Sequence, residues 1–299
     1  MYRRRKTISN GQILLLILAF CLLAAAFKYH KDTSGNIATT VSYNDSFQEL
    51  QRNYVSLDKE SQAALDLIIQ DNITSSMSPA EKIKSIHDYI ILNCAYDYDN
   101  LINDTIPDDS YNARGVFLNH TAVCQGYASA FKAAMDALSI PCKLVFGSAT
   151  NSNNITDGHV WNMVNIDDVW YQIDLTWDDP APDTPGLIRY SYFLVPDSIM
   201  LQNHQWEQDS YPVCNSANDS FISLIGPVCK NGDEIKNCLR KEYQNKATSY
   251  PVIVPTPLFQ NYKDIYPYKW ELEKELGIKL PDSVSTETYG SYTIYTFLN

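Results

Sequence analysis

The chain has 299 residues, of which 45% are hydrophobic and 19% are charged, as in a globular protein with room for one large domain or two small ones. Its formal net charge is −12. Nucleic-acid-binding proteins carry a basic face, so this acidic balance argues against a nucleic-acid partner.

The N-terminal segment predicts export. Basic residues at positions 3–6 precede an uncharged run over 13–27, which has the length of a signal sequence and is short for a full membrane span. The basic cluster predicts that the N-terminus stays inside and the rest is exported. If the alanines at 24–26 are a cleavage site, the protein is secreted. If they are not, residues 1–27 form a membrane anchor with the C-terminal part outside the cell.

The next segments predict a linker followed by helices. Residues 28–45 are polar and typical of a linker. Apolar residues recur at helical spacing over 47–70. The sequence Ser-Pro-Ala-Glu at 78–81 is typical of a helix start with a capping box, and we expect that helix to end near Cys94. Residues 100–112 predict a loop.

Cys124 opens the next predicted helix. Small and apolar residues follow it at helical intervals until Ile140 and Pro141. The N-terminus of a helix has partial positive charge and free N–H groups, which favour a thiolate and can stabilise an oxyanion. This position therefore suits a nucleophilic cysteine.

Strands follow this helix. Residues 142–147 predict one strand, and residues 159–174 predict a hairpin that turns at Asp167 and Asp168. His159 begins the first strand of the hairpin and Asp174 ends the second. Antiparallel pairing should therefore bring these two side chains together.

The remainder predicts a further strand and a small α/β region over 216–299. The expected elements are a strand at 190–195, helices near 233–244 and 262–276, and strands near 251–255 and 286–298.

The cysteines permit a disulfide but indicate no metal. Cys214, Cys229 and Cys238 lie close enough in sequence for one bridge, which an exported protein allows, although spacing does not reveal the pairing. No CxxC or paired Cys/His spacing typical of zinc occurs, so we expect no metal and no cofactor. We interpret the Asn-x-Ser/Thr sequons as chance in an Asn-, Ser- and Thr-rich sequence, and we expect an unglycosylated bacterial protein.

Three motifs carry a family resemblance. They are the Ala-Val-Cys-Gln-Gly-Tyr-Ala run at 122–128, Gly-His-Val-Trp-Asn at 158–162 and Trp-Tyr-Gln-Ile-Asp-Leu-Thr-Trp-Asp-Asp-Pro at 170–180. Together they resemble the transglutaminase-like superfamily of papain-related cysteine enzymes. The resemblance implies an α+β domain, which we place at 46–215, with the catalytic cysteine at a helix N-terminus packed on an antiparallel sheet.

The resemblance also implies a catalytic triad of Cys124, His159 and Asp174. The thiolate attacks an amide carbonyl and forms a thioester, the histidine transfers the proton, and the aspartate orients the ring. We expect an exported enzyme that hydrolyses peptide or isopeptide bonds, with a protein or peptide substrate at the cell envelope. Two alternatives remain: a cross-linking transamidase, and a non-catalytic module that binds peptides or wall polymers. The oligomeric state is open.

A second donor to the oxyanion is less clear. In relatives one donor is the backbone N–H of the nucleophile, and the other often comes from an upstream side chain, an indole in cross-linking enzymes. The chain has no Trp before Trp161, which favours a hydrolase over a cross-linker. Tyr96, Tyr98 and Gln125 are the candidate donors, and Trp161 and Trp177 are candidates for the walls of the substrate cleft.

Overall fold

The computed structural model describes residues 56–216, 221–259 and 261–298. The predicted export segment, the linker and the start of the helix predicted over 47–70 lie outside these residues. Within the described part of the chain, no helix combines the length and apolar character needed to cross a membrane.

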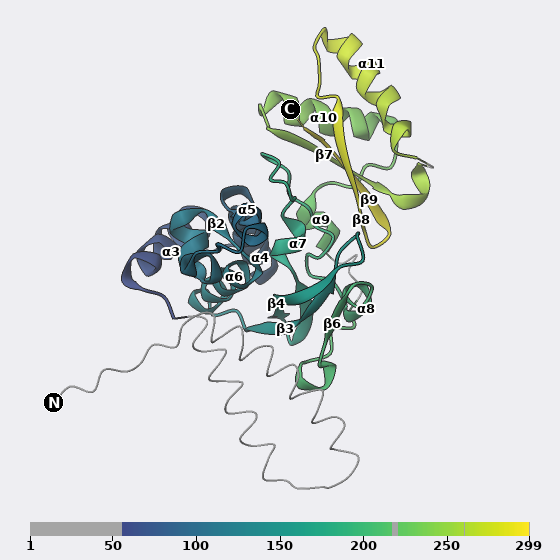
Figure 1. Ribbon diagram of the computed structural model, residues 1–299. Coiled ribbons are helices and arrows are strands. Elements are labelled where there is room, and N and C mark those ends of the chain that lie inside the picture. Colours follow the sequence, from purple (N-terminus) through teal and green to yellow (C-terminus); the bar gives the residue numbers. More distant parts are fainter. Residues whose placement is uncertain (1–55, 217–220, 260, 299) are drawn as a thin grey trace, which may run out of the picture.

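Helices form the first part of the fold (Figure 1). They are α3 (Lys59–Asn72), α4 (Pro79–Asn93), the short α5 (Tyr98–Ile102) and α6 (Cys124–Ala137). The predicted start of α4 is confirmed: the Ser78 hydroxyl accepts from the Glu81 backbone N–H, and the Glu81 carboxylate accepts from the Ser78 backbone N–H. The loop predicted over 100–112 is wrong in part, because α5 and the 3-10 turn η1 (Asp108–Tyr111) occupy much of it.

An antiparallel sheet lies against α6. Its strand order is β5-β4-β3-β6, and α6 packs on β3 and β4. The strands are β3 (Cys142–Thr150), β4 (Thr156–Ile166), β5 (Val169–Ile173) and β6 (His204–Trp206). The predicted turn between β4 and β5 is confirmed, and its residues Asp167 and Asp168 both have positive φ, as the favoured two-residue hairpin turns require.

Short elements connect these parts. Strand β1 (Ala95–Tyr96) pairs in parallel with β2 (Thr121–Ala122) immediately before α6. The other short helices are η2 (Gly115–Asn119), α7 (Leu175–Asp178), α8 (Asp197–Met200), η3 (Gln208–Ser210) and α9 (Ile222–Ile225).

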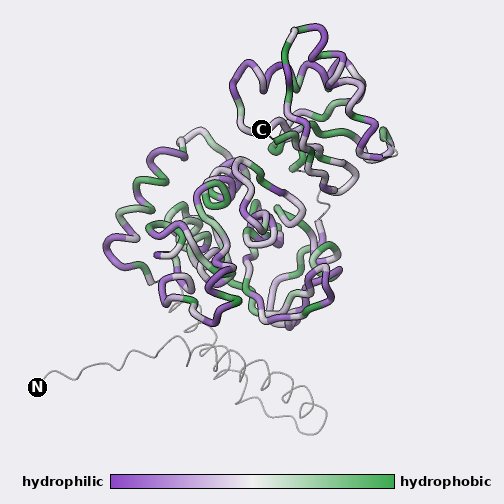
Figure 2. Tube along the Cα trace, turned by 45° about the horizontal axis from the view of Figure 1, so that its top comes forward, coloured by the Kyte–Doolittle hydropathy of each residue, from purple (hydrophilic) through white to green (hydrophobic). Residues whose placement is uncertain are grey.

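The C-terminal part has its own helices and sheet. They are α10 (Gly232–Gln244), β7 (Ser249–Pro255), η5 (Thr256–Leu258), η6 (Tyr262–Ile265), α11 (Tyr266–Leu276), β8 (Ser283–Tyr289) and β9 (Tyr292–Leu298). The strand order is β7-β9-β8, all antiparallel. In Figure 2 this part stands apart from the larger body, with hydrophobic segments inside each.

The two parts nevertheless share a core. Ile253, Tyr289 and Ile294 belong to the C-terminal sheet, yet they are buried in the hydrophobic cluster of the larger body. A second cluster between α10, α11 and the sheet contains the rest of the C-terminal core. The C-terminal sheet is therefore packed against the larger body.

Two predicted strands differ from the structure. Residues 190–195 are not a strand: only Val195 forms a β-bridge, with Gln172, and Leu194 has positive φ. The single strand predicted over 286–298 is the β8–β9 hairpin, because the chain turns at Gly290, where φ is +56°.

The cysteines suspected of one bridge lie in two places. The sulfur atoms of Cys229 and Cys238 are 2.9 Å apart, and both residues carry free thiols. Cys214 is buried elsewhere, and its backbone N–H donates to Asp197.

Candidate active site

Cys124 is the first residue of α6, as predicted. Val123 is the N-cap and forms no side-chain cap hydrogen bond. The Cys124 N–H is among the first N–H groups of the helix, which have no partner within it. The residue is half-buried and lies at the N-terminus of the helix.

His159 and Asp174 lie together, as the hairpin predicted. His159 is on β4, and Asp174 follows β5 and caps α7. Their side chains are joined by a hydrogen bond of 2.6 Å between His159 Nε2 and Asp174 Oδ2. This contact leaves the other ring nitrogen, Nδ1, for a partner on the far side of the ring.

Electrostatics join Cys124 to this pair. Burial disfavours the charged imidazole, but the Asp174 carboxylate and a hydrogen bond with the Cys124 side chain outweigh that cost and raise the pKa of His159 to about 10. Burial acts against the Asp174 carboxylate as well, yet the His159 charge holds the pKa of Asp174 well below its usual range. The arrangement favours a charged histidine beside the Asp174 carboxylate, with the Cys124 side chain as a further hydrogen-bonding neighbour.

A second histidine also binds Asp174. The Nε2 atom of His204, on β6, is 3.1 Å from the same Oδ2 atom that contacts His159. The other carboxylate oxygen, Oδ1, accepts the backbone N–H groups of Thr176 and Trp177. Both oxygens are thus fixed, which fixes the orientation of the His159 ring. Strand β6 brings His204 to the site, a placement that no local sequence pattern around this residue reveals.

The two tryptophans occupy different positions. Trp161 is 1% exposed, its ring stacks on His159, and its indole donates to Gln172. It therefore packs behind the histidine and is covered from solvent. Trp177 is partly exposed and its ring centroid is 4.7 Å from that of His204, so it lies at the edge of the site.

The structure places the three candidate oxyanion donors differently relative to Cys124. Burial, and after it electrostatic interaction with Cys124, Asp157 and Asp174, raises the pKa of the Tyr96 phenol on β1, which keeps its proton and can donate. Gln125 is buried, and Tyr98 is 57% exposed on α5. Tyr96 is therefore the candidate that the structure places in electrostatic contact with the thiol.

The site also contains donor atoms that metals can bind. Within the described residues, one atom each from His159, Asp174 and His204 lie within 4.8 Å of one another. Imidazole and carboxylate are zinc ligands, but here they bind one another through hydrogen bonds.

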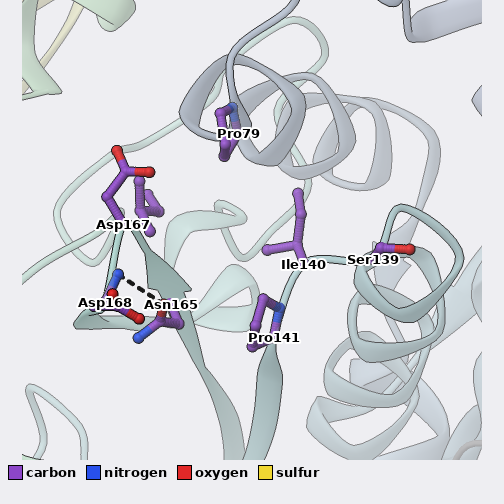
Figure 3. Close-up of a pocket in the computed structure, with 8 residues that line it drawn as sticks. Pro79, Ser139, Ile140, Pro141, Asn165, Asp167 and Asp168 are labelled. Atoms are coloured by element: carbon purple, nitrogen blue, oxygen red, sulfur yellow. Dashed lines mark hydrogen bonds between the residues drawn. The ribbon is translucent and has the colours of Figure 1, made fainter.

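A separate hollow lies away from these residues (Figure 3). It is next to the β4–β5 turn, at the opposite end of β4 from His159, where the Asp168 backbone N–H donates to Asn165. Its lining residues are Pro79, Ser139, Ile140, Pro141, Asn165, Ile166, Asp167 and Asp168. None of them belongs to the candidate triad.

Comparison with known proteins shows that part of the chain is similar to a known family. Residues 68–175 match the model described as "Transglutaminase-like superfamily". The chain therefore contains a transglutaminase-like region over these residues. The matched range contains Cys124, His159 and Asp174. The expected α+β transglutaminase-like fold is thereby confirmed, and it relates the chain to cysteine proteases and acyltransferases.

Named relatives of this transglutaminase-like domain are distant. Kyphoscoliosis peptidase from Mus musculus is 21% identical over 154 residues, a match that covers 48% of this chain and 23% of that protein. The protein of the same name from Homo sapiens matches with the same values. The chain thus spans about a quarter of the length of these curated relatives.

Solved structures show partial similarity to the transglutaminase-like chain. A TGase is 19% identical, with a TM-score of 0.34, over 50% of this chain and 38% of that one. A candidate cysteine protease from Cytophaga hutchinsonii is 22% identical, with a TM-score of 0.32, over 45% of this chain and 47% of its own. An arylamine N-acetyltransferase from Bacillus cereus, described with a Cys-His-Glu triad, is 13% identical, with a TM-score of 0.32, over 40% and 49%.

Proposed function

We propose that the protein is a cysteine acyl-transfer enzyme that hydrolyses peptide or isopeptide bonds through a thioester at Cys124. The observation that carries this proposal is the 2.6 Å hydrogen bond between His159 Nε2 and Asp174, together with the Cys124 side chain at the start of α6, which is among the groups that raise the pKa of His159. A thiolate with an oriented imidazolium is the arrangement that cysteine nucleophiles use.

The steps follow from the positions of these groups. The thiolate attacks the amide carbonyl, and the resulting oxyanion is stabilised by the Cys124 backbone N–H and the Tyr96 hydroxyl. His159 then gives its proton to the leaving amine, which departs and leaves the thioester. Water, deprotonated by the neutral His159, attacks the thioester, and the acid leaves as the thiolate and the imidazolium form again. Asp174 stays ionised throughout and holds the ring.

The export predicted from the N-terminal segment supports a substrate outside the cytoplasm. We propose a protein or peptide of the cell envelope, with the enzyme either secreted or held to the membrane by residues 1–27. The transglutaminase-like domain is proposed to extend over 46–215.

The decisive experiment is alkylation of Cys124 by iodoacetamide in the full chain, from about pH 4 to pH 9, with each cysteine followed by peptide mass spectrometry. We expect rapid alkylation at about pH 5–6 that is lost in His159→Ala. Buried Cys214 is an internal reference. Tyr96→Phe should alkylate normally and turn over an acyl substrate about 10²-fold more slowly.

The opposite outcome is equally clear. A Cys124 rate that rises only near about pH 8.5, the value for a free thiol, and is equal with and without His159, would contradict the proposal. The protein would then be better described as a binding module on this fold. If a primary amine replaces water as the acceptor in the products, the enzyme is a transamidase.

A further inference from the structure

Tyr192 connects the candidate triad to the segment that follows it. Its backbone N–H donates to Asp178 over 2.9 Å, and its carbonyl accepts the N–H of Asp174 over 3.2 Å. Its ring packs on Trp177 and on His204, with centroids 5.5 and 5.4 Å apart. The position of Tyr192 therefore determines the backbone of Asp174 and the packing of the histidine that binds its carboxylate.

Glu287, on the C-terminal strand β8, holds the two residues before Tyr192. Its Oε2 atom accepts the backbone N–H of Tyr190 at 2.8 Å and the hydroxyl of Ser191 at 2.9 Å. Burial raises the pKa of this carboxyl, and these donors, with the charge of Arg189, favour its ionised form. Burying a carboxylate is costly unless it is hydrogen-bonded, so Glu287 depends on the two donors from Tyr190 and Ser191 to keep its position.

The strand that carries Glu287 is itself fixed. β8 ends at Tyr289, which is 1% exposed and packs in the core of the larger body. Across the pair, Glu287 lies opposite Ile294, which is buried in the same core. The carboxylate is thus presented by a packed strand and has little freedom to follow residues 190–192 if they move.

We infer that the C-terminal sheet is a positioning element of the active site, and that Glu287 is a positioning residue that holds residues 190–192 and, through Tyr192, the backbone of Asp174. This inference rests on the proposed function of the triad. It gives the C-terminal part a role in catalysis although it contributes no group to the reacting atoms.

The test compares Glu287→Ala with Glu287→Gln in the full chain. The glutamine keeps an oxygen that accepts from Tyr190 and Ser191, whereas alanine does not. Thr288→Ala, an exposed neighbour on β8, is the matched control. Three readouts are used: the pH profile of Cys124 alkylation, hydrogen exchange at the amides of Asp174 and Tyr192, and the melting temperature of each variant.

We expect Glu287→Ala to slow alkylation at about pH 5–6 by about tenfold, since small displacements of a catalytic group can cost up to about 10²-fold. Its profile should shift towards higher pH, and exchange at Asp174 and Tyr192 should accelerate. Glu287→Gln and Thr288→Ala should remain close to the wild type in the alkylation and exchange readouts.

Two results would overturn the inference. One is a wild-type pH profile and wild-type exchange at Asp174 in Glu287→Ala. The other is an equal loss in Glu287→Gln and Glu287→Ala that only follows their melting temperatures, which would make Glu287 a stabilising residue without a positioning role. If wild-type Cys124 reacts independently of His159, the proposed function fails, and the exchange readout still decides whether Glu287 holds Asp174.

Discussion

At the residue scale, the protonation of His159 is the property that most directly reflects the proposed chemistry. Its pKa is raised to about 10 from an ordinary value of 6.5. Because the folded state holds the proton more tightly than the unfolded chain, the stabilisation is fully present below pH 6.5 and is lost as the pH rises towards about 10.

We expect an NMR titration to show that His159 remains protonated well above pH 7, and that Asp174→Asn lowers its pKa, because the variant removes the charge that most favours the imidazolium. Asp157→Asn is the matched control: Asp157 is an exposed carboxylate on the same strand. A wild-type His159 that loses its proton near pH 6.5, or an equal effect of both variants, would refute this assignment.

Single residues also show what the sequence could predict. The relative positions of His159 and Asp174 could be predicted from hairpin geometry, because the alternation of side chains along each strand and the turn between the strands are both encoded locally in the sequence. The contacts of His204 did not, because β6 reaches β3 only after a long connection without regular periodicity. Trp161 illustrates the same limit: its place in the motif indicated the site, and only packing shows that it lies behind the histidine.

At the element scale, helix α6 depends on close packing at its start. A Cβ atom on Gly126 would lie 2.6 Å from the Ser110 carbonyl oxygen and 2.7 Å from the Ala122 side chain. Glycine therefore lets the helix that carries Cys124 lie against β2 and η1. The resemblance implied that this helix packs on the antiparallel sheet; at Gly126 the close neighbours belong to η1 and β2.

Gly126→Ala should displace the start of α6, destabilise the fold by about 1–3 kcal/mol through overpacking, and slow Cys124 alkylation. Thermal unfolding and the alkylation assay measure the two effects. Gly158→Ala is the matched control, since a Cβ at that position meets nothing within 4 Å. Similar losses in the two variants would show that the close approach at Gly126 is not what positions Cys124.

In the C-terminal part, the helices were predicted more accurately from the sequence than the strands were. The helices predicted near 233–244 and 262–276 correspond to α10 and to η6 with α11. The hairpin of β8 and β9 was missed because Tyr289 and Tyr292 flank a short turn at Gly290, within a run of strand-forming residues. The irregular segment 190–195 was mistaken for a strand because it is rich in apolar residues that are buried. Its Tyr190 and Tyr192 backbone N–H groups donate to the carboxylates of Glu287 and Asp178 instead of to a neighbouring strand.

At the scale of the whole molecule, the question is whether the C-terminal part unfolds with the transglutaminase-like domain. The boundary predicted at residue 216 would allow independent units. Against this, Ile294 of β9 is buried in the core of the larger body and pairs with Ile253, which is buried in the same core. Shared burial makes the stability of each part depend on the other.

We therefore expect Ile294→Ala to lower the stability of both parts together, by about 2–5 kcal/mol, as is usual for Ile→Ala in a core. Hydrogen exchange in α4 and in α10, followed in increasing denaturant, measures the two parts separately. Leu239→Ala, in the second cluster, is the comparison, because its cavity forms away from the shared core. If Ile294→Ala accelerates exchange in α10 and leaves α4 unchanged, the parts fold independently. An equal rise in both segments means that the C-terminal sheet and the domain that contains the candidate triad unfold as one cooperative unit, which is the condition for Glu287 to hold Asp174 in place.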